Sequence, residues 1–230
     1  MVFYHFMWDL YFFQLYEANV QVGPWKNFAR GIATTFIFVV GVSLTLSYNR
    51  EKQRADLTNL FPRYLRRGAK IFGLGLVVTL GTYLFLGRGF VIFGILHLIG
   101  VSVVLAYPLL HVSRWISLAA GILLIPLGFY LNTLRVSFPW LIWLGVNQYG
   151  RYMVDYYPLL PWFGVALLGI FAGYTLYPQG QPRFSLPNLA SFAPVQGLRF
   201  LGRHSLLIYI IHQPILIALL FALGFASIPQ

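Results

Sequence analysis

Cysteine is absent from the 230-residue sequence, and acidic residues are rare, with 5 Asp and Glu against 16 Lys and Arg. Without cysteine the protein has no disulfide, no thiolate nucleophile and no Cys-ligated metal or cluster. Charged residues make up only 9% of the chain, whereas soluble domains have about a quarter. Hydrophobic residues make up 59%, which is more than a soluble core could hide. The composition therefore predicts an integral membrane protein.

Long uncharged stretches separate the few charged residues, and several are long enough to cross a membrane as a helix. Runs such as ILLIPLGFYL are apolar on every side, which favours helices over the alternating strands of a barrel. We expect an all-α, polytopic transmembrane bundle of about seven spans, which leaves residues 1–230 no room for a second, soluble domain. The expected spans are 1–18, 29–48, 70–87, 90–111, 115–133, 158–177 and 204–226.

Basic residues cluster beside these spans, so the net charge of +11 indicates membrane orientation rather than nucleic-acid binding. Segment 50–70 carries the densest cluster and is expected to be cytoplasmic, like the N-terminus. Segment 137–150 is too short for a comfortable span and is expected to be interfacial or re-entrant on the outer side. The linker 178–198 is rich in Pro, Gly, Ser and Gln, which predicts a cytoplasmic loop. Arg199 and Arg203 follow it on the same side.

Ionisable residues within the spans are the candidate functional groups, because each costs roughly 2.5–3.5 kcal/mol to insert. His5 and Asp9 are four residues apart, so they lie on one face of the first helix. There the carboxylate could orient the imidazole as a general base, and we treat both as candidate catalytic residues. The alternative is an interhelical hydrogen bond that stabilises the bundle.

Two further histidines fall within expected spans. His97 lies between Gly94 and Gly100, which allow another backbone to approach closely, so it is either catalytic or packed. His212 lies on a polar stripe of the last span and is a candidate substrate-binding residue. Pro214 leaves a backbone carbonyl near His212 without its helical donor, which makes His212 the weaker candidate.

Two charged residues and two prolines lie just before and at the start of the sixth span. Arg151 and Asp155 are four residues apart there, and two prolines follow. If this segment lines a vestibule, Asp155 is a candidate catalytic group. Arg151, Tyr156 and Trp162 would then suit a sugar or another polar ligand. The alternative is an exposed ion pair. The motif GIFAG at 169–173 indicates helix packing rather than chemistry.

Five stretches of the chain carry a family resemblance when they are taken together and in order. They are VFYHFMWDL (2–10), FIFVVGVSLTLS (36–47), RYLRRGAKIFGLGLVVTLGT (63–82), FGILHLIGVSVVL (93–105) with DYYPLLPWFGVALLGI (155–170), and LRFLGRHSLLIYIIHQPIL (198–216). They resemble the bacterial membrane proteins related to heparan-α-glucosaminide N-acetyltransferase, within the membrane acyltransferase superfamily. The resemblance implies an enzyme of the bacterial cytoplasmic membrane. Such an enzyme transfers acetyl or another acyl group from cytoplasmic acyl-CoA to a hydroxyl or amine of a glycan or other outer acceptor.

The resemblance also implies roles for individual residues. His5 matches the first-helix histidine that such enzymes use as a base or transient acyl acceptor, and Asp9 is its neighbour. No metal is expected. The family's first helix usually opens with an Arg-Gly pair about three turns before that histidine. This chain begins after that point, so we expect part of its first helix to be missing. A basic cluster at a cytoplasmic span end could hold the CoA phosphates, or could orient the protein and contact anionic lipid: Arg63, Arg66, Arg67 and Lys70.

Other functions fit the same residues. A non-catalytic membrane subunit packed against a larger membrane complex would have few buried charges. Possible partners of the chain are membrane lipids, further copies of itself in a homo-oligomer, or such a complex. A transporter would line a path with the same polar stripes. A haem carrier would ligate iron through His97 and His212 from different helices.

Overall fold

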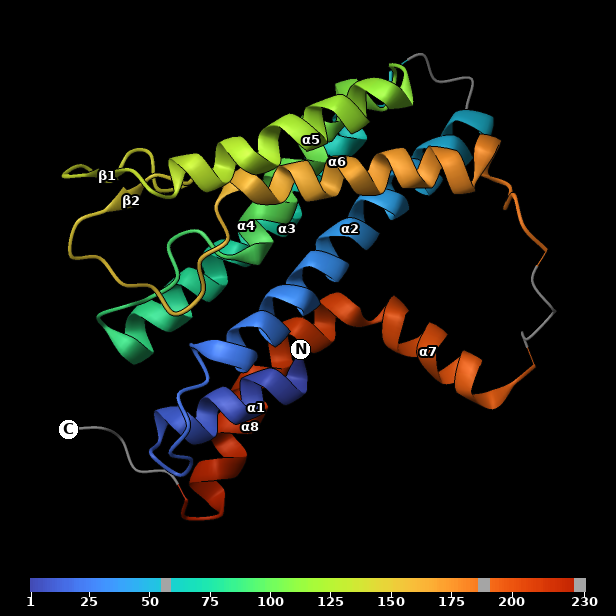
Figure 1. Cartoon of the computed structure of the whole chain (residues 1–230). Helices are drawn as coiled ribbons and strands as arrows, with labels where there is room; N and C mark the ends of the chain where they lie inside the picture. The colour runs from blue at the N-terminus through green and yellow to red at the C-terminus, as the bar shows by residue number, and fades with distance from the viewer. Residues whose placement is uncertain (55–58, 186–190, 226–230) are drawn as a thin grey trace. The chain divides into compact units, whose positions relative to one another are not determined.

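The computed structural model describes residues 1–54, 59–185 and 191–225, and helices dominate it (Figure 1). The elements in chain order are α1 (Val2–Phe12), α2 (Gly23–Arg54), α3 (Phe61–Leu86), α4 (Ile95–Leu109), α5 (Arg114–Leu131), β1 (Arg135–Val136), β2 (Asn147–Gln148), α6 (Leu159–Leu176), the 3-10 turn η1 (Pro178–Gly180), α7 (Ala193–Arg203) and α8 (Ser205–Ala222). The predicted all-α, polytopic fold class is confirmed.

Five of these helices are long and apolar enough to cross a membrane: α2, α3, α5, α6 and α8. Each coincides with an expected span. The expected span 90–111 corresponds to the shorter apolar helix α4, and 1–18 corresponds to α1, which has 11 residues. Helix α3 begins at Phe61, well before the expected residue 70, because proline fits the first turn of a helix and Pro62 occupies it. The basic residues of this region therefore continue α3.

Two connecting segments differ in outcome. Segment 137–150 forms turns and contains β2, which pairs in parallel with β1, so it is not a spanning helix, as expected. The linker 178–198 was expected to be a loop, and this is wrong for its last part, where α7 begins at Ala193. Pro194 fits the first turn of a helix, and Val195, Leu198 and Leu201 recur at three-residue spacing along one side.

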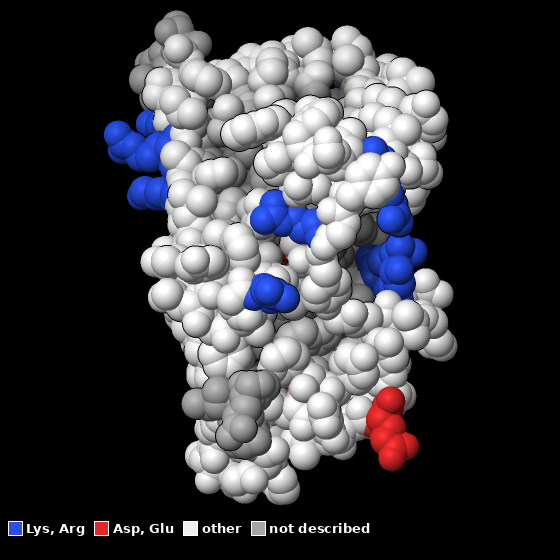
Figure 2. Space-filling view, turned by 90° about the vertical axis from the view of Figure 1, so that its left-hand side faces the viewer, with Lys and Arg blue, Asp and Glu red and all other residues white. Residues whose placement is uncertain are grey.

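Large apolar side chains are exposed along the spanning helices, including Leu84, Leu123 and Phe129 at 74%, 67% and 61%. Figure 2 shows a mainly uncharged face on which Lys and Arg gather in a few groups. Soluble proteins rarely expose apolar patches of this size to water. Lipid is therefore the solvent that this surface fits.

The chain divides into two compact units, Met1–Ala33 with Ser185–Gln230, and Thr34–Phe184. In the first unit α1 lies against α8 (Figure 1). The rings of Phe13 and Phe221 meet edge to face at 5.7 Å, and His5 meets His212. The contact nearer the start of α1 is also the one nearer the start of α8, so the two helices run parallel. This parallel direction agrees with the expected topology, in which the first and last of seven spans run the same way.

The second unit is built around α4, most of whose residues are buried. Helix α3 packs on α4, and α5 packs on α6. A Cβ on Gly68 would lie 2.6 Å from the carbonyl oxygen of Gly100, so glycine allows α3 and α4 to touch through their backbones. A Cβ on Gly169 would overlap the carbonyl oxygen of Phe38 in α2. The GIFAG motif therefore packs α6 against α2, as expected from its spacing.

Candidate active site

The first unit holds a pair of histidines between α1 and α8. The rings of His5 and His212 are stacked, with centroids 4.7 Å apart, and Nδ1 of His5 is hydrogen-bonded to Nε2 of His212. His212 is buried and His5 is half-buried. The packing of α1 against α8 brings the two imidazoles together. His5 was predicted to be catalytic and His212 to bind substrate, and in the structure they form one centre.

The hydrogen bonds of this pair define its tautomers. Nδ1 of His212 lies 2.9 Å from the backbone carbonyl oxygen of Ile208. A carbonyl can only accept, so Nδ1 of His212 donates and its Nε2, in the neutral ring, is an acceptor. Nδ1 of His5 must then donate to that Nε2. The other nitrogen of His5, Nε2, is left with a lone pair, which is the form required of a base or nucleophile.

Asp9, one turn after His5, is completely buried. Its Oδ1 accepts a hydrogen bond from the side-chain amide of Gln213, so its partner is Gln213, whereas the group that orients His5 is His212. Among the described residues, Oδ2 of Asp9 and Oε1 of Gln213 have no hydrogen-bond partner. Sequence reasoning missed Gln213, although a second polar residue beside His212 in an apolar helix was a usable signal.

His97 lies in the second unit, in the first turn of α4. Its Nδ1 accepts a hydrogen bond of 3.2 Å from the backbone N–H of Gly94, and its Nε2 lies 3.4 Å from the hydroxyl of Thr79. Phe72 meets its ring edge to face, and a Cβ on Gly75 would lie only 3.0 Å from it. These are the contacts of a packed helix cap, and a catalytic role for His97 stays a prediction.

The histidine contacts also bear on the haem alternative. Nδ1 of His212 is bonded to a carbonyl and its Nε2 to His5. Both nitrogens of His97 likewise have protein partners. Iron ligation needs an imidazole nitrogen with a free lone pair. Neither ring offers one without breaking a hydrogen bond.

Asp155 caps the start of α4 from the segment before α6. The backbone N–H of Ile95 donates to its carboxylate, and Oδ2 sits where a side chain on Gly94 would lie. Burial raises the pKa of the Asp155 carboxyl to about 6, against the lowering effect of the Ile95 hydrogen bond. Arg151 donates to the side-chain oxygen of Gln148 at 3.0 Å. Arg151 and Asp155 thus each contact a different partner and do not form the alternative ion pair.

The other predicted substrate-binding residues of this segment have structural contacts. The hydroxyl of Tyr156 donates to the carbonyl oxygen of Ile142 at 2.7 Å. The ring of Trp162 lies 5.1 Å from that of Tyr157. These contacts attach the segment to its neighbours in the second unit. Ligand binding by Arg151, Tyr156 and Trp162 stays a prediction.

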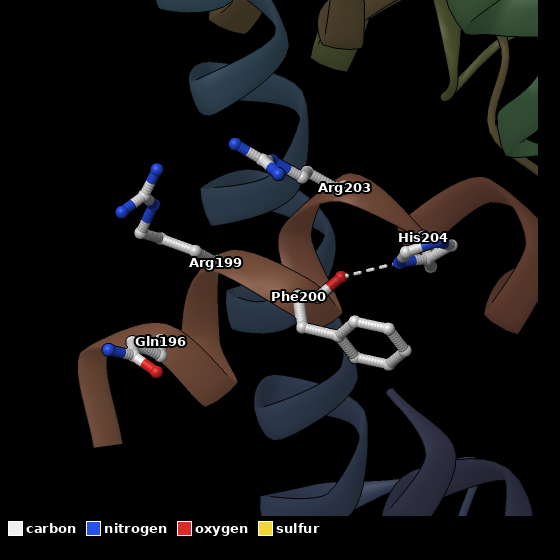
Figure 3. Close-up of a pocket in the computed structure, with 5 residues that line it drawn as sticks. All are labelled: Gln196, Arg199, Phe200, Arg203 and His204. Atoms are coloured by element: carbon white, nitrogen blue, oxygen red, sulfur yellow. Dashed lines mark hydrogen bonds between the residues drawn. The ribbon is translucent and has the colours of Figure 1, made fainter. Parts of the chain in front are cut away.

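Two basic surfaces are candidates for an anionic ligand. The first lies on α3 in the second unit, where four exposed residues share one face because they are spaced by three and four: Arg63, Arg66, Arg67 and Lys70. Their role in binding CoA stays a prediction. The second is a shallow groove of about 260 Å³ on α7 in the first unit (Figure 3), lined by Gln196, Arg199, Phe200, Arg203 and His204. Sequence reasoning used Arg199 and Arg203 only for topology.

Five helices apolar and long enough to span a membrane, together with a pair of histidines between α1 and α8, define an integral membrane protein with a histidine centre. Residues 1–214 match the family model of heparan-alpha-glucosaminide N-acetyltransferase, catalytic. The chain belongs to this family, which confirms the resemblance seen in its sequence and gives it a membrane acetyltransferase-like function. Comparison with curated proteins and with solved structures found no match.

Proposed function

We propose that the protein transfers an acetyl or other acyl group from acyl-CoA in the cytoplasm to a hydroxyl or amine of a glycan or other acceptor beyond a bacterial cytoplasmic membrane. The observation that carries this proposal is the His5–His212 pair, in which the hydrogen bonds leave Nε2 of His5 as a lone-pair nitrogen. Acyl transfer requires such an atom, because a neutral hydroxyl is a poor nucleophile.

Two routes use this nitrogen. In direct transfer, Nε2 of His5 takes the proton of the acceptor hydroxyl while its oxygen attacks the thioester carbonyl carbon. The carbon–sulfur bond breaks, and the CoA thiolate takes the proton back from His5. In the two-step route, Nε2 attacks the carbonyl carbon itself and CoA leaves as thiolate. The acceptor then attacks the acyl-imidazolium and gives its proton to the thiolate. Both routes yield acylated acceptor and free CoA thiol.

Other groups of the same interface have supporting roles. His212 is a positioning residue, because its Nε2 accepts the hydrogen bond that Nδ1–H of His5 donates and so leaves Nε2 of His5 free. Oδ2 of Asp9, one turn from His5 on α1, and Oε1 of Gln213, next to His212 on α8, are buried oxygens without hydrogen-bond partners in the described residues. Buried acceptors favour a ligand that donates hydrogen bonds. The hydroxyl or amine group that receives the acyl group donates hydrogen bonds and so meets this requirement.

Purified protein in detergent, incubated with acetyl-CoA labelled in the acetyl group, tests the proposal. We expect label to leave CoA in step with release of free thiol. His5→Ala should lower this rate by about 10²–10⁴-fold, the usual contribution of acid–base catalysis. His212→Leu should lower it less, and His212→Gln should restore part of the loss because its amide oxygen can accept from His5.

His111→Ala is the matched control, because His111 is exposed and lies in the other unit. Thermal melting in detergent should show that all variants are folded. If labelled CoA stays intact with wild-type protein and a range of hydroxyl and amine acceptors, the non-catalytic subunit is the better description. If His5→Ala retains full turnover, the protein is an acyltransferase but the His5–His212 pair is not its catalytic centre.

A further inference from the structure

The groove on α7 has two cations on one side and an aromatic ring on the other. Arg199 and Arg203 are one turn apart, and Figure 3 shows both guanidinium groups extending to the same side of the helix. The ring of Phe200 is 60% exposed and lies 4.3 Å from the ring of His204. The groove therefore combines phosphate-binding groups with a platform on which a base can stack.

The two arginines repel one another, and in the described part of the first unit no acidic side chain pairs with either. Like charges four residues apart destabilise a helix. Residues 156–230 contain no Asp or Glu at all. In the first unit the acidic residues are Asp9, which binds Gln213, and Glu17. Within the described residues neither Arg199 nor Arg203 has an ion pair. An external anion is the natural counter-charge.

The position of the groove relative to the histidine pair fits one particular anion. α7 ends at Arg203 and α8 begins at Ser205, so the two helices adjoin at His204. His212 is eight residues further along α8, which is about 12 Å at 1.5 Å per residue. The pantetheine arm of CoA, from diphosphate to sulfur, is about as long as four extended residues and reaches about 14 Å. The arm is therefore long enough to follow α8 from the His204 edge of the groove to His212, which contacts His5.

We infer that the α7 groove binds the phosphorylated nucleotide end of the acyl-CoA donor, with Arg199 and Arg203 on its phosphates and Phe200 beneath its adenine. The inference rests on the proposed acyl transfer. The groove volume of about 260 Å³ suits part of such a molecule, because whole small-molecule pockets are about 300–1,000 Å³. The basic surface of α3 is the rival site. The phosphate of an anionic lipid headgroup is the rival ligand for the same arginines.

Direct binding of CoA to the full chain in zwitterionic nanodiscs, measured by isothermal titration, tests the inference. We expect Arg199→Gln and Arg203→Gln each to weaken CoA binding about tenfold, and the double variant more than either. Phe200→Ala should weaken it as well. Binding of pantetheine, which lacks phosphate and adenine, should be the same for all of these proteins and for wild type.

Arg183→Gln is the matched control, since it removes an exposed arginine expected on the same side of the membrane, and it should bind CoA like wild type. His5→Ala should also bind CoA normally while losing transfer, which separates the groove from the reaction. If wild type binds no CoA, the proposed function itself fails. If Arg63→Gln with Arg66→Gln abolishes CoA binding while the α7 variants do not, the inference is overturned.

The lipid source is separated in a second arm. The same variants are titrated with CoA in nanodiscs that contain anionic phosphatidylglycerol. If the α7 arginines serve lipid, their substitution should reduce co-purified phosphatidylglycerol and leave CoA affinity unchanged, and this result also overturns the inference. If they bind CoA, anionic lipid should leave the tenfold differences in place.

Discussion

Asp155 shows two opposing effects acting on one carboxyl group. Its place at the N-terminus of α4 favours the charged form, an effect worth typically 0.3–1 kcal/mol and up to ~2 kcal/mol. Burial opposes it and wins, because the pKa of Asp155 lies at about 6 rather than near its ordinary value. Between about pH 4 and pH 6, therefore, Asp155 holds a proton in the folded protein, whereas in the unfolded chain it has already lost that proton.

The free energy of unfolding should consequently fall as pH rises through this interval, since the folded state binds more protons there. Asp155→Asn keeps an oxygen for the N–H of Ile95 but removes the charge. We expect this variant to lack that part of the pH slope and to be more stable than wild type above pH 7 by about 1–2 kcal/mol. Thermal unfolding in detergent at pH 4.5 and pH 7.5 measures this. Equal slopes in both proteins would contradict it.

Among secondary-structure elements, the crossing of α2 and α6 depends on the absence of side chains. A Cβ at Gly169 would overlap the carbonyl oxygen of Phe38, and one at Gly41 would overlap that of Ala166. The atoms in the way are backbone, which cannot move aside without shifting a helix. Small residues that allow such close backbone contact are typical of helix pairs in membranes, where lipid removes the hydrophobic drive for association.

Gly169→Ala should therefore destabilise the protein by about 2–3 kcal/mol, the upper range for overpacking. Gly73→Ala is the control, because a Cβ at Gly73 meets nothing within 4 Å and alanine favours a helix by up to ~1 kcal/mol. The melting temperatures and the monodisperse fractions after detergent extraction should separate the two variants. Similar melting temperatures would show that α2 and α6 adjust at little cost.

At the scale of the whole molecule, the arrangement of spans makes a prediction about sidedness. The absence of cysteine allows single cysteines to be introduced without further changes. Tyr149→Cys, at a residue 64% exposed, should react with a membrane-impermeant maleimide in intact cells. Arg183→Cys, also exposed, should react only after the membrane is permeabilised. Both expectations follow from the distribution of basic residues. Labelling of both in intact cells would contradict the topology.

Sequence length and hydropathy were sufficient for the spanning helices, because a membrane crossing sets a minimum apolar length that is visible in any single segment. Helix α7 was missed because it is short and amphipathic, and because Pro194 and Gly197 indicate a loop when the surrounding composition is polar. The partner of His5 could not be predicted either. His5 and Asp9 lie one turn apart in sequence, whereas His212 and Gln213 come from the far end of the chain.

The His5–His212 contact joins positions 207 residues apart, and it needs both α1 and α8. A ribosome makes α8 long after α1, so a chain that is still being synthesised holds His5 without the neighbour that sets its tautomer. Such a chain has no fixed lone pair at Nε2 of His5, so in the proposed mechanism it would transfer acyl groups more slowly than the finished protein. Synthesis of α8 would thus complete the proposed centre, and premature termination before α8 would leave a membrane protein in which the proposed transfer is impaired.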